Sequence, residues 1–350
     1  MKESTKINLL NLLKKHVFYT DGFWTLDNEL STEEKIREFV KSQGVPILEK
    51  DVTDILSELS FNKAKFNIDG YMRGRVRSMA AKSTGKSKYF ESMDKLYPGN
   101  KLREIMNYYL FSEETYCFIL VGYGSTGKST FVNLISAIIG EDYFGRSNVT
   151  QLRGSHGTSI LESKLVFEVT EAQDIDVDTF NLLKSVISND DIIINPKFQQ
   201  QRKFKPHSKI IMTCNNYPRW KVTDDGAIRR NIPIVMNEKI KKQNKRFIEE
   251  IKDDIPNIVK EALEHPFNID DFVCEQYSIF ENDPQYGFGY GKLPQEESWS
   301  GSTPYEKYCT KCSVLGYHKR NKTNFDKFNE LQKIYYERVE CVITSQDWLD

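Results

Sequence analysis

Gly122-Tyr123-Gly124-Ser125-Thr126-Gly127-Lys128-Ser129 is the stretch of sequence that decides the fold. It matches the phosphate-binding loop G-x-x-x-x-G-K-[ST] at every defined position, and it lies between an apolar run, residues 116–121, and an amphipathic segment, residues 131–139. Glycines let such a loop curl so that backbone N–H groups point at phosphate oxygens, and the start of the following helix adds positive potential. The sequence therefore predicts a buried strand, a phosphate-binding turn and a helix, in that order.

Within this loop each residue type has an expected role. The Lys128 ammonium can reach the β- and γ-phosphates of a nucleoside triphosphate, and the Ser129 hydroxyl can ligate Mg²⁺. We therefore expect ATP and Mg²⁺ as cofactors. The residues expected to hold them are Gly122, Gly124, Ser125, Thr126, Gly127, Lys128, Ser129 and Thr130.

A shorter copy of the motif occurs upstream. Thr84-Gly85-Lys86-Ser87 repeats its last four residues, but Ala80 stands where the first glycine is required and no apolar strand precedes it. Residues 70–90 contain six Lys or Arg and no Asp or Glu. We expect an exposed basic stretch here and no second nucleotide site.

The wider pattern predicts an α/β protein. From about residue 106 to residue 236, apolar strands alternate with amphipathic helices, which is typical of a mostly parallel sheet flanked by helices. Upstream, the chain reads as mainly helical, with one β-hairpin turning at Asp21-Gly22. We expect four parts: a mainly helical domain over 1–104 for oligomerisation or DNA binding, an ATPase domain over 105–265, an acidic linker over 266–301 and a small domain over 302–350.

Composition narrows the functional classes. The 350 residues are 39% hydrophobic and 28% charged, which supports a folded core and excludes global disorder. Lys and Arg (49) nearly balance Asp and Glu (50), so a uniformly basic nucleic-acid binder is excluded and any such site must be a local patch. Six scattered cysteines, no apolar run of membrane-spanning length and no signal-peptide pattern favour a cytoplasmic protein.

A second strand carries the candidate carboxylates. Leu-Val-Phe-Glu-Val-Thr-Glu at 165–171 is a strand that ends at Glu171, and we expect this side chain to polarise the attacking water and to share the Mg²⁺ with Ser129. Glu168 lies in the middle of the same strand. A metal role and an ordinary exposed-face position are both open for it.

Two further elements are candidates for completing a triphosphatase. Asn215 ends the apolar strand 209–215 and could hydrogen-bond the γ-phosphate or the attacking water, although an ordinary turn residue is the alternative. Arg229 and Arg230 lie on a short connection before another strand, where an arginine can face a neighbouring subunit's nucleotide. A surface ion pair is the alternative for this pair.

A basic hairpin is the candidate DNA-binding element. Residues 192–223 contain seven Lys or Arg and no Asp or Glu, and two short strands, 191–195 and 202–205, flank the tip 196–200. Positive charges suit a phosphate backbone and an aromatic ring suits a base or sugar, whereas a solvated hairpin is the plain alternative. The residues expected to contact single-stranded DNA are Lys197, Phe198, Arg202 and Lys203.

In this order and spacing the motifs resemble the superfamily 3 helicases, a branch of the AAA+ ATPases, and especially the primase-helicases of phages, plasmids and poxviruses. The resemblance covers roughly residues 105–236. Besides the loop and the acidic strand, it rests on Leu-Leu-Lys-Ser at 182–185, Phe-Lys-Pro at 204–206, Thr-Cys-Asn-Asn-Tyr-Pro at 213–218 and Asp-Gly-Ala-Ile-Arg-Arg at 225–230.

The resemblance implies an AAA+ P-loop core and a ring-shaped homo-hexamer that moves 3′ to 5′ on single-stranded DNA. It implies that Asn215 is the polar sensor, that Arg229 or Arg230 is the arginine finger, and that Lys197 lies at the tip of a hairpin lining the channel. Replication of a phage, plasmid or other mobile element is the implied setting. An origin and a separate primase or initiator are the implied partners.

Two departures from the family pattern bear on this reading. Thr170 precedes the catalytic carboxylate where many relatives have an acid, and no primase constellation is present upstream. The chain thus resembles the helicase half alone. Two other functions are open: an AAA+ loader or packaging motor that separates no strands, and an origin-binding protein whose nucleotide only promotes assembly.

The last fifty residues permit two interpretations. A basic turn at 318–322 precedes an amphipathic helix, which suits either a winged-helix DNA reader or a small helical cap. Cys309 and Cys312 have the spacing of a zinc ligand pair, but no second pair has a recognised spacing, so zinc is not predicted.

Overall fold

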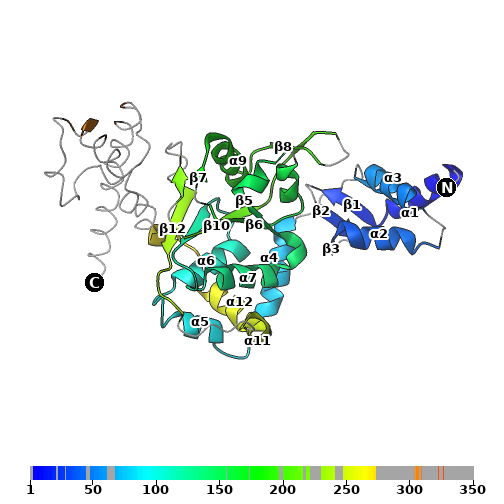
Figure 1. Cartoon of the computed structure of the whole chain (residues 1–350). Coiled ribbons are helices and arrows are strands. Elements are labelled where there is room, and N and C mark those ends of the chain that lie inside the picture. Colours follow the sequence, from blue (N-terminus) through cyan, green and yellow to red (C-terminus); the bar gives the residue numbers. More distant parts are fainter. Residues whose placement is uncertain are drawn as a thin grey trace.

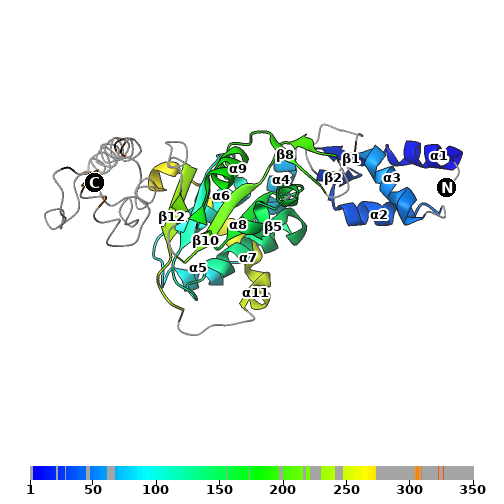
Figure 2. The same ribbon diagram turned by 45° about the horizontal axis from the view of Figure 1, so that its top comes forward.

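The computed structural model shows an α/β body with the N-terminal elements at one side (Figures 1 and 2). Among the described residues, no helix combines the length and the apolar composition needed to cross a bilayer. The structure describes residues 3–20, 23–27, 29–44, 48–60, 68–154, 156–172, 174–196, 200–215, 218–220, 230–240 and 247–272, together with single residues between 303 and 326.

The central sheet confirms the predicted α/β class with a parallel sheet flanked by helices. Within the described part of the chain it has five strands in the order β12-β4-β10-β6-β5, and every neighbouring pair is parallel. Helices cover both faces, so the central strand β4 is a continuous apolar run, whereas the edge strand β5 is mostly polar. The strands are β4 (Cys117–Val121), β5 (Phe144–Asn148), β6 (Val166–Thr170), β10 (Lys209–Cys214) and β12 (Asn231–Val235).

The two faces of the sheet bury two separate clusters. Phe118 and Leu120 of β4 pack into the cluster that includes α7 (Lys128–Ile139). Ile119 points to the other face, where its cluster includes α9 (Val177–Ile187). This alternation is the period of two that a strand imposes on its side chains. It places the helix that follows the phosphate loop on one face only.

The face of the sheet that carries α7 is covered by helices that precede the α/β segment in the sequence and by one that follows it. These are α4 (Ile68–Ala80), α5 (Lys88–Met93), α6 (Lys101–Phe111) and α12 (Ile255–Glu264), and all contribute to the same apolar cluster. The expected domain boundary between residues 104 and 105 falls inside α6. The helices before the phosphate loop are thus packed as part of the body that carries it.

The expectation of an exposed basic stretch over 70–90 holds only around residues 81–86, because α4 has a buried face and Ser87, Tyr89 and Phe90 are also buried. Ile68, Met72 and Val76 recur at every fourth residue, are buried, and give α4 an apolar face against the body. The intervening arginines cover the helix; Arg75, for instance, donates to the Ile139 carbonyl oxygen at 3.2 Å. The high charge of the stretch concealed this narrow apolar face.

The loop with the shortened motif is bound to α12. The Asn257 side-chain oxygen accepts hydrogen bonds from the backbone N–H groups of Thr84 (3.0 Å) and Gly85 (3.2 Å). These are the groups that a phosphate would need. The arrangement agrees with the prediction that this segment is not a second nucleotide site.

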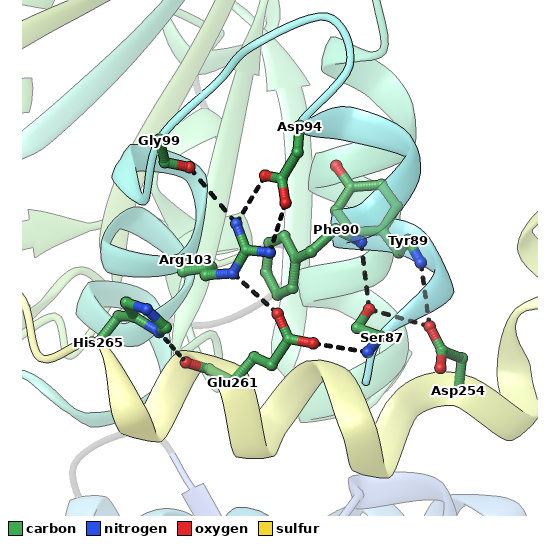
Figure 3. A network of polar contacts seen from close by, with 9 residues as sticks. All are labelled: Ser87, Tyr89, Phe90, Asp94, Gly99, Arg103, Asp254, Glu261 and His265. Atoms are coloured by element: carbon green, nitrogen blue, oxygen red, sulfur yellow. Dashed lines mark hydrogen bonds and ion pairs between the residues drawn. The ribbon is translucent and has the colours of Figure 1, made fainter. Parts of the chain in front are cut away.

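A polar network joins α5, α6 and α12 (Figure 3). The Arg103 guanidinium donates to both carboxylate oxygens of Asp94 (2.7 and 2.8 Å) and to Glu261 (2.8 Å), and it stacks over the Phe90 ring at 4.5 Å. Glu261 also accepts from the Ser87 backbone N–H at 2.6 Å. The network fixes α5, which lies beside the phosphate loop, to α6 and α12.

The N-terminal segment contains both helices and a sheet. The predicted hairpin is confirmed: β1 pairs with β2 antiparallel, and β3 adds to β2. Phe23 on β2 is 1% exposed and packs into the cluster of the α/β body, with its ring 6.3 Å from that of Tyr143. The elements are α1 (Glu3–Leu13), β1 (Val17–Thr20), β2 (Phe23–Leu26), β3 (Glu29–Ser31), α2 (Glu33–Lys41) and α3 (Glu49–Leu59).

The basic hairpin is also confirmed as a pair of antiparallel strands, β8 (Ile192–Ile194) and β9 (Arg202–Phe204). Residues 197–199 lie outside the described part of the chain, as do 273–302 and nearly all that follow. The expectations for the linker, the C-terminal domain and Cys312 fall there. The remaining short elements are α8 (Val149–Leu152), β7 (Asp174–Ile175), β11 (Arg219–Trp220) and α11 (Phe247–Glu250), with one-turn helices at Glu141–Tyr143, Gly157–Leu161, Lys252–Asp254 and Ile269–Phe272.

Candidate nucleotide-binding site

A cavity of about 900 Å³ opens at the carboxyl edge of the central sheet. The phosphate loop forms one wall, and the ends of β6 and β10 form another. The carboxyl edge is where open α/β sheets bind their ligands. The polar residues that line the cavity are Ser92, Gly124, Ser125, Thr126, Gly127, Lys128, Ser129, Thr130, Asn133, Arg146, Glu168, Thr170, Glu171, Thr213 and Asn215.

The glycines of the loop are required by its geometry. Gly122 has φ 153°, and a Cβ placed there would lie 2.0 Å from the Met236 carbonyl oxygen. Gly127 has φ 98° and is the N-cap of α7, where it brings no side chain to the end of the helix. Only glycine tolerates both positions, and the backbone N–H groups at the start of α7 therefore face the loop.

The Lys128 ammonium folds back onto the loop that precedes it. It donates to the carbonyl oxygens of Gly122 and Tyr123, the latter at 2.7 Å, and to the Thr126 hydroxyl at 3.4 Å. The residue is 8% exposed, and burial lowers the pKa of its ammonium. Carbonyl oxygens thus hold the charge at the cavity wall, within the loop that a phosphate would enter.

Residues far from the motif brace the loop on its outer side. The Tyr97 hydroxyl lies 3.1 Å from the carbonyl oxygens of both Thr126 and Glu238 and can donate to either. The Ile240 backbone N–H donates to the Ser125 carbonyl oxygen at 2.9 Å. The segment after β12 therefore closes over the loop, and Tyr97 joins the two.

The two carboxylates of β6 lie in different environments. Glu168 is 3% exposed; the Thr213 hydroxyl donates to one of its oxygens at 2.8 Å and the Arg146 guanidinium to the other. This burial excludes the exposed-face interpretation. Glu171 is exposed, follows the end of the strand with φ 52°, and reaches the same cavity.

Sequence reasoning missed Arg146 and Asn133. Arg146 lies directly opposite Glu168 in the register of β5 and β6, and its guanidinium also donates to the Asn133 side-chain oxygen at 2.7 Å. Asn133 is one turn after Ser129 on α7, so both side chains lie on the same helix face. No local motif marks an arginine inside a short strand, and only the strand register reveals the pair.

The wall beside Gly127 is apolar and comes from outside the motifs. Met93 of α5 would be 3.1 Å from a Cβ at Gly127, and Ile240 would be 3.6 Å from it. Tyr89 and Leu96, which come from the same stretch of sequence as Met93, also line the cavity. An apolar wall of this kind suits a flat nucleobase, whereas the wall around Glu168 carries charged side chains.

The sensor and finger candidates lie at different edges of the sheet. Asn215 is exposed and lines the cavity at the end of β10. Arg230 precedes β12, whose first residue pairs with Cys117 at the start of β4, so it lies at the opposite edge from the phosphate loop. Five residues of strand separate those edges by about 16 Å. Arg229 lies outside the described residues.

Of the four residues expected to bind DNA, the structure describes Arg202 and Lys203, and their surroundings differ. Arg202 donates to the Glu162 carboxylate, and the Tyr19 hydroxyl of the N-terminal hairpin donates to the same group. Burial of Glu162 raises the pKa of its carboxyl, which Arg202 opposes. Lys203 is exposed. Lys197 and Phe198 lie outside the described residues.

Comparison with known proteins gives one family match. The model of a family of unknown function, DUF5906, matches residues 120–230, about a third of the chain. No curated protein matches.

Solved structures give weak matches. They include apo structures of the NrS-1 C-terminal region. One has 16% identity and a TM-score of 0.44, covering 74% of this chain and 69% of that one. Another has 14% identity and a TM-score of 0.47, covering 95% and 86%.

Proposed function

We propose that this chain is an ATP-dependent DNA helicase of the superfamily 3 type that works as a homo-hexamer on single-stranded DNA during replication of a phage, plasmid or other mobile element. The observation that supports this best is the convergence, on one cavity, of the phosphate loop, Glu168, Glu171 and Asn215. These residues come from three neighbouring parallel strands. They supply the phosphate cradle, the carboxylates and the polar sensor that triphosphate hydrolysis requires.

The residues present fit ATP with Mg²⁺. The loop N–H groups and Lys128 would hold the triphosphate, and Ser129 with the carboxylate oxygens offers the hard oxygen ligands that Mg²⁺ prefers. When bound, Mg²⁺ would neutralise charge between the β- and γ-phosphates. Glu171 would orient and polarise the attacking water, and Asn215 would hydrogen-bond the terminal phosphate or that water.

The position of Arg230 supports an assembly of several copies. It lies at the far edge of the sheet from its own chain's loop, so a role as the finger would require the nucleotide of another copy. A head-to-tail interface of this kind closes into a ring. Such a ring would use Arg229 or Arg230 as the finger and would carry the β8–β9 hairpins, with Lys197 and Phe198 at their tips, towards the bound strand.

Strand displacement on forked DNA with 3′ or 5′ single-stranded tails tests the proposal. We expect ATP-driven unwinding of the 3′-tailed fork, loss of ATP hydrolysis in Lys128→Ala, and loss of unwinding with retained basal hydrolysis in Lys197→Ala. DNA-stimulated hydrolysis without displacement would instead indicate a loader or packaging motor. Nucleotide binding without turnover would indicate an assembly switch at an origin, and a mass measurement with and without nucleotide would report the ring.

A further inference from the structure

The Arg146 guanidinium combines a buried partner with an open position. Its side chain is 48% exposed, whereas the Glu168 side chain that it contacts is 4% exposed. Its hydrogen bonds to Glu168 and Asn133 use two of the five N–H donors that a guanidinium carries. The Arg146 guanidinium therefore borders the cavity with further N–H donors available, while it neutralises the buried Glu168 carboxylate.

The Arg146–Glu168 pair lies on the side of the cavity where the terminal phosphate of a nucleotide is expected. Asn133 lies one turn after Ser129, the hydroxyl expected at the metal between the β- and γ-phosphates, and both line the cavity. The apolar Met93 and Ile240 lie instead beside Gly127. A triphosphate with its base against the apolar residues would direct its terminal phosphate towards Glu168 and Arg146.

The charges that line the cavity favour a rearrangement of the Arg146–Glu168 ion pair when a nucleotide binds. Among the described residues that line it, Lys128 and Arg146 are positive, and Glu168 and Glu171 are negative. A terminal phosphate offers a guanidinium two anionic oxygens in the planar, bidentate geometry that arginine prefers. A bound divalent cation would meanwhile compete with Arg146 for the Glu168 oxygen.

We propose that Arg146 binds the terminal phosphate of the nucleotide held by its own chain, and that it exchanges its ion pair with Glu168 for this contact. A bound triphosphate would draw the guanidinium to its terminal phosphate, and the Glu168 carboxylate would then be available to hold Mg²⁺. A diphosphate lacks the acceptor, so the ion pair persists. This assignment rests on the proposed nucleotide site and is separate from any arginine that a neighbouring copy supplies.

Equilibrium binding of Mg²⁺ complexes of ADP and a non-hydrolysable ATP analogue tests this role without relying on turnover. We expect Arg146→Gln to weaken binding of the ATP analogue by about tenfold or more, the effect of losing a charge-assisted contact, and to change ADP binding less than twofold. Arg146→Lys keeps the charge without the bidentate geometry and should fall between. Arg153→Gln is the matched control, because Arg153 is 43% exposed and pairs with Asp176 on another element.

The outcomes separate the two proposals. Equal losses for both nucleotides, or no loss, would overturn the role of Arg146 and leave the site intact. If the wild-type chain binds neither nucleotide, both proposals fall. Should Arg146→Gln fail to fold because the buried Glu168 is left without its cation, the double variant Arg146→Gln/Glu168→Gln removes that charge. It must then bind the ATP analogue less selectively than Glu168→Gln alone, and equal selectivity in these two variants would overturn the role of Arg146.

Discussion

The Tyr97 hydroxyl lies 3.1 Å from the carbonyl oxygen of Thr126, so a side chain from the segment between α5 and α6 contacts the backbone of the phosphate loop. The same hydroxyl lies 3.1 Å from the Glu238 carbonyl oxygen, beyond β12. Burial raises the pKa of Tyr97 above its ordinary value. The loop is thus held in shape by residues before and after the α/β segment.

Tyr97→Phe should therefore weaken nucleotide binding while the fold persists. Loss of one hydrogen bond to the loop is expected to cost about 1 kcal/mol, or roughly fivefold in affinity for ADP and ATP alike. Titration with a fluorescent nucleotide measures this. Tyr116→Phe removes a hydroxyl beyond the opposite edge of the sheet and should leave the affinity unchanged; an equal effect there would refute the contact's role.

Substitutions of Glu168 and Glu171 should have different effects on the kinetics of ATP hydrolysis. We expect Glu171→Gln to lower the turnover of ATP by about a hundredfold or more, the usual loss on removing a general base, and to raise the Mg²⁺ concentration required less than Glu168→Gln does. Glu168→Gln should raise that Mg²⁺ requirement, because its oxygens are the buried ligand candidates. Hydrolysis rates over a Mg²⁺ titration distinguish the two, and the reverse pattern would exchange their roles.

Arg202 and Lys203 should differ although they are neighbours in the basic hairpin. Lys203→Ala removes an exposed charge, and we expect weaker binding of single-stranded DNA with a salt-dependence slope reduced by about 0.7. Arg202→Ala leaves the partly buried Glu162 without its cation and should lower the melting temperature. Anisotropy titrations at several salt concentrations, beside thermal unfolding, compare them. A stability loss in Lys203→Ala would contradict the assignment.

The local elements could be predicted from the sequence because their signals are local. The phosphate loop, the apolar strands and the hairpin at Asp21-Gly22 are each encoded within about ten residues. Arg146 and Tyr97 could not be found this way, since one depends on the register between β5 and β6 and the other on the packing of α5 beside the loop. The α4 helix was missed because its few apolar residues are separated by arginines.

The Arg103 network should dominate the stability of the helical face (Figure 3). Arg103 and Glu261 have side chains only 9% and 12% exposed, so removing one partner leaves a charge with little access to water. We expect Arg103→Met to lower the free energy of unfolding by about 3–5 kcal/mol. Urea denaturation measures the change. Arg73→Met, which breaks an ion pair to the exposed Glu113, is the control and should cost about 1 kcal/mol or less.

Lys209 should give the protein a pH-dependent stability near neutrality. Its ammonium donates to the carbonyl oxygens of Tyr108 and, at 2.6 Å, of Ser112, yet burial lowers its pKa from the ordinary 10.5 to about 7. Asp69, with Glu113 and Glu114, raises this pKa and Arg73 lowers it. The unfolded chain therefore binds a proton above pH 7 that the folded chain does not.

The stability contribution of Lys209 accordingly rises from pH 7 towards pH 10.5 and is lost as the pH falls through 7, with a slope of up to about 1.4 kcal/mol per pH unit. Buried Cys117 and Cys214 act in the opposite direction, because their raised pKa values favour the folded chain below about pH 9 and lose this effect above it. Comparing urea denaturation of the wild type and Lys209→Met between pH 6.5 and 8.5 cancels the cysteine effect. The variant should show the shallower rise with pH, and parallel curves would mean that Lys209 stays charged in the folded protein.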